Sequence, residues 1–264
     1  MCVLHPYADI PMIVVSGLGR SGTTLLRNCI AAHPEIDARN QESNYLFSLM
    51  RGGNLAMEDE FLVRFLAVKT SEFWNLHREM ILNLCWPKVQ KANSSVKAIA
   101  TYTKLDPRAA MGLEKTFKRL SIIYALRNGI EVVSSFQSFK PFQNLSFADA
   151  CRLWSIRYDM FQYCRDNEHA TLIRYELLAS DQEKWEASID ECLQRVGLSF
   201  HDGCRKPLSK PFAPTRFEGE SRQDAKDLSK RKDRWRLWTE EQKDVFVDVC
   251  GQAMQDLGYE IPWL

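Results

Sequence analysis

The chain has 264 residues, of which 45% are hydrophobic and 26% are charged. That size and apolar content suit one folded domain over residues 1–264, and they exclude a disordered chain or a coiled-coil rod. Because 35 Lys and Arg residues stand against 34 Asp and Glu residues, no overall positive charge is present to attract nucleic acid. Any anion-binding site is therefore expected to be local.

The first predicted element is a buried strand, the apolar and β-branched run Met12-Ile-Val-Val-Ser16. A loop punctuated by glycines, Gly17-Leu-Gly-Arg-Ser-Gly-Thr-Thr24, follows it and leads into a predicted helix that ends before Pro34. The N–H groups of such a loop and the N-terminus of the helix converge on one point. A strand, a glycine loop and a helix in this order therefore predict a phosphate-binding loop.

Residues 43–93 follow, and we expect them to be largely helical. They are rich in Leu, Phe, Trp and Met, and they interrupt the alternation of strands and helices. We expect this segment to form a helical cap over the edge of a sheet, where it could also line an acceptor pocket. Its aromatic residues Phe73, Trp74 and Trp86 are expected to belong to the core first.

Three more apolar runs predict strands, at residues 95–100, 121–126 and 170–175. Helical segments separate them, and a last helix is predicted after Thr239, where Thr-Glu-Glu-Gln forms a capping-box pattern. Strands that alternate with helices favour parallel pairing, because a parallel connection needs a crossover. The sequence therefore predicts an α/β fold: a single three-layer domain with a central parallel β-sheet, a P-loop-like strand, loop and helix, and the helical cap.

The segment 205–236 is predicted to be a basic loop. It contains three prolines, and its eleven Lys and Arg residues against five Asp and Glu residues give it a net charge of +6, which leaves −5 for the rest of the chain. Proline interrupts regular structure, and a local excess of positive charge attracts an anion. We therefore expect this segment to be a lid over an anionic ligand.

The glycine loop differs from the loop of nucleotide-dependent kinases at one position. Residues 17–24 fit the pattern G-x-x-x-x-G-K-[ST] except that Thr23 stands in place of the Lys. The strand 121–126 ends in Arg127, whereas these kinases need a carboxylate after a second strand to hold Mg²⁺. The positive charge of the loop comes from Arg20 instead, so we expect no metal.

Four motifs in this order resemble the sulfotransferase family that uses 3′-phosphoadenosine 5′-phosphosulfate (PAPS). Gly19-Arg-Ser-Gly-Thr-Thr24 is similar to the family's 5′-phosphosulfate loop, and Arg127-Asn-Gly-Ile-Glu-Val-Val-Ser-Ser135 to its 3′-phosphate motif. Arg174-Tyr-Glu-Leu177 is similar to the strand end whose Tyr meets the adenine. Lys232-Asp-Arg-Trp235 is similar to a basic segment that closes on the cofactor. The resemblance extends from about residue 12 to about residue 259.

The resemblance implies a donor site with two anion-binding parts, the loop for the 5′-phosphosulfate and Arg127 for the 3′-phosphate. Open α/β sheets place their ligands at the carboxyl ends of their strands, where both parts would meet. A planar guanidinium suits a phosphate dianion. Arg20 suits the charge that develops on the leaving phosphate, so we expect it to be catalytic as well. The implied donor-binding residues are Gly19, Arg20, Ser21, Gly22, Thr23, Thr24, Arg127, Ser135, Tyr175, Arg231 and Lys232.

The acceptor's proton requires a general base, and the branches of the family differ in this residue. In small-molecule cytosolic relatives the base is a His two residues after a Lys on a strand, but Lys97 is followed at that spacing by Ile99. Branches that act on glycans or protein tyrosine use a Glu beyond the second strand. Asn40-Gln-Glu-Ser-Asn-Tyr-Leu-Phe47 is similar to that pattern. The resemblance thus implies Glu42 as the base and Lys97 at the bridging oxygen, with His77 as a second candidate base.

The sequence therefore favours a PAPS-dependent sulfotransferase that acts on a hydroxyl group of a small or medium-sized metabolite, with an amine as the less favoured acceptor. A carbohydrate acceptor, a nucleotide-dependent kinase and a nucleotide-binding module without turnover remain as alternatives. We expect neither nucleic acid nor a membrane as a partner. The oligomeric state stays open.

The eight cysteines show no C-x-x-C pair, which predicts reduced thiols rather than a disulfide framework or a zinc site. No apolar run approaches the roughly 20 residues that a membrane-spanning helix needs. The first residues lack the basic and apolar regions of a signal peptide. We therefore expect a cytoplasmic protein.

Overall fold

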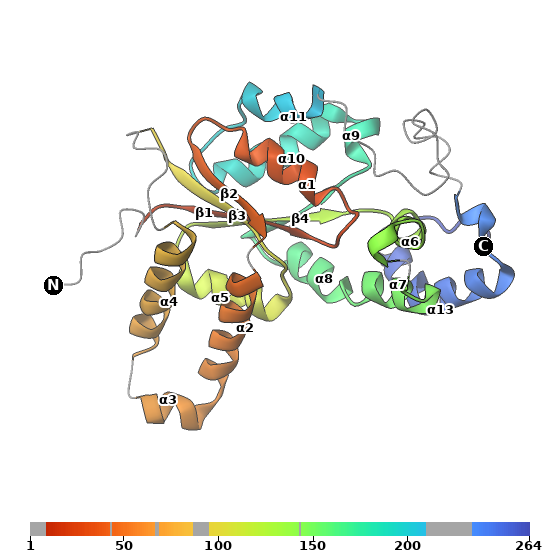
Figure 1. Cartoon of the computed structure of the whole chain (residues 1–264). Coiled ribbons are helices and arrows are strands. Elements are labelled where there is room, and N and C mark those ends of the chain that lie inside the picture. Colours follow the sequence, from red (N-terminus) through yellow and green to blue (C-terminus); the bar gives the residue numbers. More distant parts are fainter. Residues whose placement is uncertain (1–8, 43, 67–68, 87–94, 143, 210–233) are drawn as a thin grey trace.

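A computed structural model of the chain describes residues 9–42, 44–66, 69–86, 95–142, 144–209 and 234–264, with a sheet of five strands in the order β2-β3-β1-β4-β5 (Figure 1). The strands are β1 (Met12–Gly17), β2 (Ile36–Glu42), β3 (Ala98–Tyr102), β4 (Leu120–Leu126) and β5 (Ala170–Arg174). All neighbouring pairs are parallel, and Met12 lies opposite both Ile99 and Leu120. The carboxyl end of β1 therefore lies between the carboxyl ends of β3 and β4.

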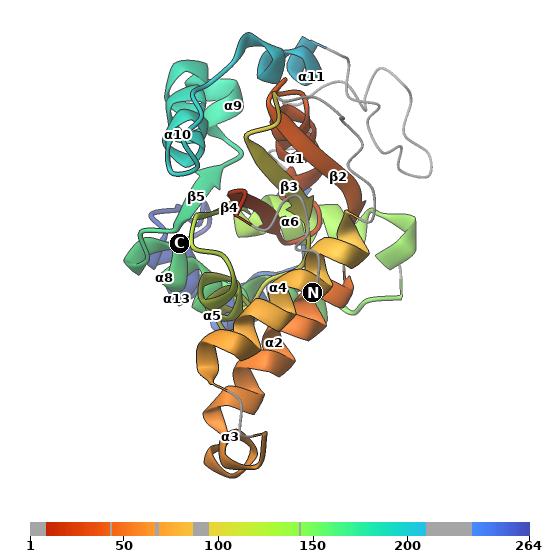
Figure 2. The same ribbon diagram turned by 90° about the vertical axis from the view of Figure 1, so that its left-hand side faces the viewer.

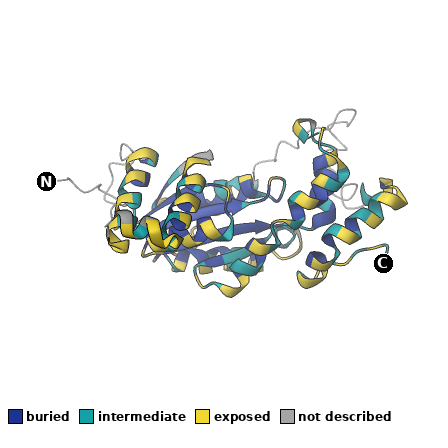
Figure 3. Cartoon of the chain, turned by 90° about the horizontal axis from the view of Figure 1, so that it is seen from below, coloured by how far each residue is buried: buried dark blue, intermediate teal, exposed yellow. Residues whose placement is uncertain are grey.

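The central strands are buried on both faces, in agreement with their continuous apolar runs. Every residue of β4 is buried, and so are the first five residues of β1. Alternate residues enter different cores, with Met12 and Val14 in one cluster and Ile13 and Val15 in the other. Figure 3 shows the same distribution, with buried residues along the strands and exposed residues on the outward faces of the helices.

Helices cover both faces of the sheet, which confirms the predicted three-layer α/β fold (Figure 1). One face packs against α1 (Thr23–Ala31) and α10 (Gln182–Gln194), and the other against α5 (Pro107–Thr116) and α8 (Tyr158–Asp166). Further elements are α6 (Gly129–Gln137), α7 (Phe147–Ser155), α9 (Leu177–Ser180), α11 (Lys206–Ser209), α13 (Glu240–Asp256) and the short 3₁₀ turns η1 (Lys140–Phe142), η2 (Asp202–Arg205) and η4 (Arg234–Leu237). The capping box predicted at Thr239 is present at the start of α13.

A helical arm stands out from the sheet, and it consists of α2 (Asn44–Glu58), α3 (Glu60–Leu66) and α4 (Thr70–Cys85). This confirms the helical character expected for residues 43–93 within the described part of that segment. The base of the arm joins the core through buried residues such as Leu46 and Met50. Helix α2 approaches α5 so closely that a Cβ on Gly112 would come within 2.6 Å of the Met50 carbonyl oxygen. The α3 end of the arm projects away from the sheet (Figures 1 and 2).

The edge strand β2 is the element that the apolar pattern did not predict. Its sequence, Ile-Asp-Ala-Arg-Asn-Gln-Glu, contains no apolar run. It pairs with β3 through Ile36 and Ala98, and its register shifts between Ala38 and Glu42. Glu42 is the last residue of this strand and lies opposite Tyr102 at the carboxyl end of β3.

Candidate functional site

The predicted phosphate loop connects β1 to α1. Its turn is closed by a hydrogen bond from the Ser21 N–H to the Leu18 carbonyl oxygen at 3.1 Å. Gly22 precedes the first turn of α1 with a φ of 87°, a left-handed conformation that glycine adopts without strain. Gly22 has no side chain to cap the helix, so no capping hydrogen bond occupies the first N–H groups of α1. This is the local geometry that suits an anion.

Arg127, at the end of β4, lies against this loop. Its Nη1 donates to the Arg20 carbonyl oxygen at 3.0 Å, and its side chain is only 15% exposed. Its Nε and Nη2 donate to Glu131 Oε2 at 2.8 and 2.6 Å. Each contact uses one N–H group, and Nη1 and Nη2 carry two N–H groups each. In the described part of the chain, the second N–H of Nη1 and of Nη2 therefore makes no hydrogen bond. Glu131 thus fixes the guanidinium while leaving its outer edge for an anion.

Arg20 reaches from the loop to helix α6. Its Nε donates to Ser135 Oγ at 2.9 Å, and its guanidinium carbon lies 4.5 Å from the centre of the Phe139 ring. The backbone of Arg20 has a φ of 75°, in the left-handed region. Arg20 belongs to the glycine-loop motif and Ser135 to the motif that begins at Arg127. These two motifs are therefore in direct contact, although the two residues are 115 positions apart in the sequence.

Tyr175, just beyond β5, completes the group. Its N–H donates to the Leu126 carbonyl oxygen at 2.8 Å, and its ring lies 4.5 Å from the guanidinium carbon of Arg127. The ring also packs on Gly22 so tightly that a Cβ on this glycine would overlap it. We call Arg20, Gly22, Arg127, Ser135 and Tyr175 the donor-site cluster, after the role that the resemblance implies for them.

The other loop residues predicted to bind the donor lie beside this cluster. Ser21 and Thr23 are buried, whereas Gly19 and Thr24 are exposed. Thr23 and Thr24 begin helix α1, which places their N–H groups in its first turn.

Glu42, the predicted base, is the last residue of β2. It therefore lies at the carboxyl ends of the strands, as the loop does. The resemblance places the base just beyond the second strand, whereas the backbone of Glu42 forms the last residue of β2, and its side chain lies outside the described residues. The alternative base, His77, lies on α4, where its Nδ1 is 2.9 Å from the Phe73 carbonyl oxygen and its ring is 4.1 Å from the Phe73 ring. Gly53, which faces His77, is nine residues from the start of α2, about 13 Å along the helix. His77 therefore lies within the arm rather than beside the loop.

The prediction for Lys97 is wrong, because this residue lies where the strands have their amino ends, whereas the loop lies at their carboxyl ends. Lys97 precedes β3, whose five residues span about 16 Å. Its N–H donates to the Glu35 carbonyl oxygen at 2.9 Å, and its Nζ lies 2.5 Å from Glu35 Oε1. The hydrogen bond from Lys97 holds the pKa of Glu35 below its usual value. Lys97 forms this surface ion pair and is too distant to act at the loop.

A lysine that does lie at the loop end of the sheet is Lys104, which was not among the predicted site residues. It follows β3 directly after Thr103, whose N–H donates to the Val15 carbonyl oxygen of β1 at 3.3 Å. Val15 is only two residues before the loop begins at Gly17. The tendency of ligands to lie at strand carboxyl ends, which points to Arg127 after β4, points equally to Lys104 after β3.

Arg231 and Lys232 lie outside the described residues, as does most of the predicted lid 205–236. Its described parts are the end of η2, helix α11 and the turn η4. In η4, the Trp235 ring lies 5.2 Å from the Trp263 ring of the C-terminal segment. The turn η4, at the C-terminal end of this basic segment, thus packs on the C-terminal segment of the chain.

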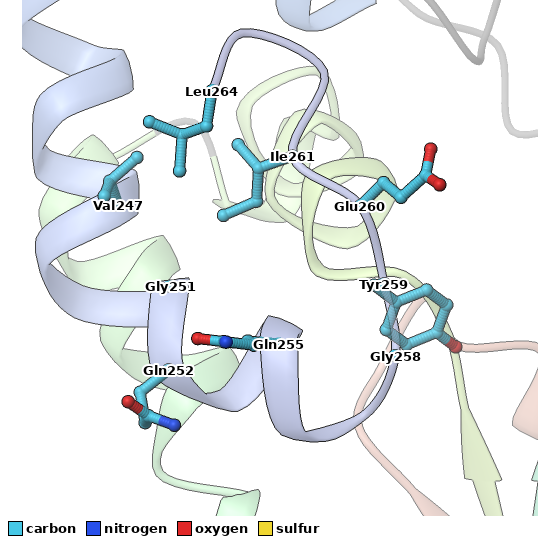
Figure 4. A pocket seen from close by; sticks show the side chains of 9 residues that line it. All are labelled: Val247, Gly251, Gln252, Gln255, Gly258, Tyr259, Glu260, Ile261 and Leu264. Carbon is cyan, nitrogen blue, oxygen red and sulfur yellow. The ribbon is translucent and has the colours of Figure 1, made fainter.

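A cavity of about 630 Å³ lies between α13 and the C-terminal segment (Figure 4). It is lined by Val247, Gly251, Gln252, Gln255, Gly258, Tyr259, Glu260, Ile261 and Leu264. It shares no residue with the donor-site cluster.

Within the described ranges, no group of three or more His, Cys, Asp or Glu side chains is arranged to hold a metal ion. None of the helices in the described part of the chain combines the length and apolar composition needed to cross a bilayer.

The architecture first defines a broad class of protein. A parallel sheet with a glycine loop between β1 and α1, in which Thr23 occupies the lysine position and Arg20 supplies the positive charge, is a P-loop-like α/β fold suited to an anionic ligand. Comparison with known proteins identifies the family within this class.

A model of the sulfotransferase family matches residues 11–202, and the chain belongs to this family. Over 186 residues it is 25% identical to the protein-tyrosine sulfotransferase of Drosophila melanogaster, which corresponds to 67% of this chain but only 36% of that protein. The chain thus spans about a third of the length of this relative. Family membership supports sulfuryl transfer as the class of reaction.

Solved structures share the fold at low sequence identity. The sulfotransferase domain of the Synechococcus PCC 7002 olefin synthase has a TM-score of 0.56 and 17% identity, with 96% of each chain covered. The sulfotransferase domain of the curacin biosynthetic pathway has a TM-score of 0.54 and 15% identity, with 96% of this chain and 99% of that chain covered. A sulfotransferase from Alicyclobacillus acidocaldarius has a TM-score of 0.51 and 14% identity, with 96% and 97% covered.

Proposed function

We propose that this chain transfers a sulfuryl group from PAPS to a hydroxyl group of a small or medium-sized metabolite, without a metal ion. The observation that carries the proposal is the contact between the two arginine-bearing segments, in which Arg127 Nη1 donates to the Arg20 carbonyl oxygen at 3.0 Å. This contact brings two cationic side chains to one edge of the sheet. A donor with a phosphate at each end of its ribose needs such a pair of neighbouring anion sites.

The residues of the donor-site cluster suit the parts of this donor. The outer edge of the Arg127 guanidinium suits the 3′-phosphate, and the N–H groups of the loop and α1 suit the 5′ end. Tyr175 offers its ring beside both for the adenine. When bound, PAPS supplies the sulfuryl group. The hydrogen-bonding N–H groups of the chain stabilise the charge that grows on the leaving phosphate. One such preorganised hydrogen bond typically lowers the activation barrier by roughly 3–4 kcal/mol.

Glu42 removes the acceptor's proton in this proposal. The support is the position of its backbone at the carboxyl end of β2, on the edge of the sheet that carries the loop. Lys104, at the carboxyl end of β3, is a further cation at this edge and replaces Lys97 in our assignment.

A tyrosine hydroxyl of a protein is a second candidate acceptor. It is favoured by the similarity to a protein-tyrosine sulfotransferase. A carbohydrate hydroxyl remains a third. A kinase is disfavoured because Thr23 stands in place of the loop lysine and Arg127 follows β4.

The proposal is tested by incubating the full chain with sulfur-labelled PAPS and three acceptor sets: phenolic and alcoholic metabolites, tyrosine peptides, and oligosaccharides. We expect the labelled sulfur in a metabolite of the first set. Label found only in the peptides, or only in the oligosaccharides, would instead identify that class of compound as the acceptor. Glu42→Gln should lower turnover by about 10²–10³-fold, because it removes the base. The dissociation constant of 3′,5′-bisphosphoadenosine should change less than about twofold.

Glu35→Gln is the matched control, since Glu35 precedes the same strand at the opposite edge and should leave turnover unchanged. Full turnover in Glu42→Gln would refute Glu42 as the base. Tight binding of the bisphosphate without transfer to any acceptor would favour a silent binding module. Turnover of ATP with Mg²⁺ would favour the kinase.

A further inference from the structure

The carboxylate of Glu176, two residues beyond β5, has both oxygens engaged. Its Oε1 accepts from the Asn128 N–H at 2.7 Å, and its Oε2 accepts from the Tyr259 hydroxyl at 3.1 Å. Glu176 therefore links the C-terminal segment to the residue that follows Arg127. Glu176, Asn128 and Tyr259 are not among the residues predicted to bind the donor.

The backbone at residues 127–129 is held on several sides. Asn128 caps α6 with its own side chain, whose Oδ1 accepts from the Ile130 N–H at 2.9 Å. Trp154 Nε1 donates to the Arg127 carbonyl oxygen at 3.1 Å. Gly129 packs against Trp154, and a Cβ there would come within 2.9 Å of the indole ring. The bond to Glu176 fixes a further polar group of this stretch, the Asn128 N–H.

Tyr259 is itself held in place. Its N–H donates to the Met254 carbonyl oxygen at 2.9 Å, and its ring lies 4.8 Å from the guanidinium carbon of Arg174. Figure 4 shows its hydroxyl pointing away from the C-terminal cavity that its ring lines. Burial, followed by the nearby Glu176 carboxylate, raises the pKa of Tyr259, so the hydroxyl remains protonated and donates.

A carboxylate near an anion site is unfavourable unless its oxygens are directed elsewhere. The two hydrogen bonds aim Glu176 at Asn128 and Tyr259, so its charge supports the backbone beside Arg127. If the Tyr259 hydroxyl is lost, one carboxylate oxygen loses its donor. The side chain can then rotate and release the Asn128 N–H. Arg127 would lose part of its alignment, although no residue of the donor-site cluster has changed.

We propose that Tyr259, acting through Glu176 and the Asn128 N–H, is a positioning residue for the 3′-phosphate part of the donor site. The proposal rests on the function proposed above for its ligand, and on the observed hydrogen bonds for its coupling. It gives the C-terminal segment a role in donor discrimination.

The test is Tyr259→Phe in the full chain, with binding measured by calorimetry. Loss of one hydrogen bond should weaken 3′,5′-bisphosphoadenosine by about fivefold. Binding of 5′-AMP should change less than about twofold, because 5′-AMP lacks the 3′-phosphate. Equal losses for both ligands, or none, would overturn the proposal.

Tyr163→Phe is the matched control. The Tyr163 hydroxyl also donates to a glutamate, Glu114, which likewise accepts a second hydrogen bond, from Asn167 Nδ2 at 2.7 Å. This variant removes the same kind of bond away from the donor-site cluster and should not change the ratio of the two affinities. A ratio that falls as far as in Tyr259→Phe would overturn the proposal.

A second measurement needs no ligand. Hydrogen exchange at the Asn128 amide should become faster in Tyr259→Phe and in Glu176→Leu, but not in Tyr163→Phe. Glu176→Gln, which keeps an acceptor oxygen, should restore most of the protection. Unchanged exchange in Tyr259→Phe would overturn the coupling. If the unmodified chain binds no bisphosphate but the exchange responds as expected, the proposed donor fails while the coupling stands.

Discussion

Ser135 shows how one hydroxyl can connect two parts of the site. It accepts from Arg20 Nε at 2.9 Å and is buried on α6, the helix that follows Arg127. Without this acceptor, the guanidinium of Arg20 would keep its charge but lose one of the contacts that fix its direction. Preorganisation of a cation is what distinguishes a binding site from a merely positive surface.

We therefore expect Ser135→Ala to weaken 3′,5′-bisphosphoadenosine by about fivefold to tenfold, with the free energy of unfolding reduced by about 1 kcal/mol. Titration calorimetry and thermal unfolding measure the two effects.

Ser134→Ala is the matched control, because the buried Ser134 Oγ has no hydrogen-bond partner among the described residues. Its loss should leave affinity unchanged and should not destabilise the chain. If both variants lose affinity equally, the packing of α6 matters rather than the Ser135 hydroxyl.

At the scale of elements, the turn between β1 and α1 depends on glycine at one position. Gly22 combines a φ of 87° with close packing on the Tyr175 ring, so both its backbone and its lack of a side chain are used. The same position thus sets the path of the loop and its distance from β5.

Gly22→Ala should lower the free energy of unfolding by about 2–4 kcal/mol, through backbone strain and displacement of Tyr175. In a chain of this size, that corresponds to a melting temperature lower by roughly 5–10 °C, which calorimetry would measure.

Gly19→Ala is the comparison variant, since a Cβ there meets nothing within 4 Å. Its melting temperature should stay within about 2 °C of the unmodified chain. Equal losses in the two variants would mean that the loop tolerates no side chain at all, and that the contact with Tyr175 is not the cause.

The strands that could be predicted are those whose apolar runs are buried on both faces. The predicted ranges 12–16, 121–126 and 170–175 lie within one residue of β1, β4 and β5. Strand β2 could not be predicted in this way, because an edge strand can be polar and still pair through its backbone. The order of the strands depends on pairing between distant segments, which local patterns do not encode.

The donor-site cluster was predicted residue by residue, but its contacts were not. Motifs identified Arg20, Ser135 and Tyr175, while the bond from Arg127 to the Arg20 carbonyl oxygen depends on the chain path. The error at Lys97 came from the resemblance, which selected this lysine by its spacing to Ile99, while the strand predicted to start at 95 begins only at Ala98. An apolar run shows that a strand exists without showing which residue begins it.

At the scale of the whole molecule, the cysteines report on the integrity of the core. None of the described cysteines forms a disulfide, and six of them are buried, with Cys85 half-buried. Burial disfavours the thiolate and raises the pKa of Cys29 and of Cys164 to about 12, and that of Cys192 to about 11. At pH 8 these thiols are protonated and shielded, and only a thiolate is readily alkylated.

We therefore expect iodoacetamide at pH 8 to modify Cys85 in the native chain and to leave the six buried thiols unmodified, as read by peptide mass spectrometry. In denaturant all eight cysteines of the sequence should react. Native labelling of a buried thiol at the rate of Cys85 would show that the core opens more readily than its burial indicates.

Arg20 is the one residue other than glycine with a positive φ in the described part of the chain. A glycine or an asparagine there would relieve a cost of about 1 kcal/mol, but it would also remove the guanidinium. The same replacement would break the hydrogen bond from Arg20 to Ser135, which is worth about as much as the relieved strain. Laboratory evolution under thermal selection alone should therefore find little difference between arginine and glycine at this position, whereas selection for product should retain the guanidinium that the proposed function requires.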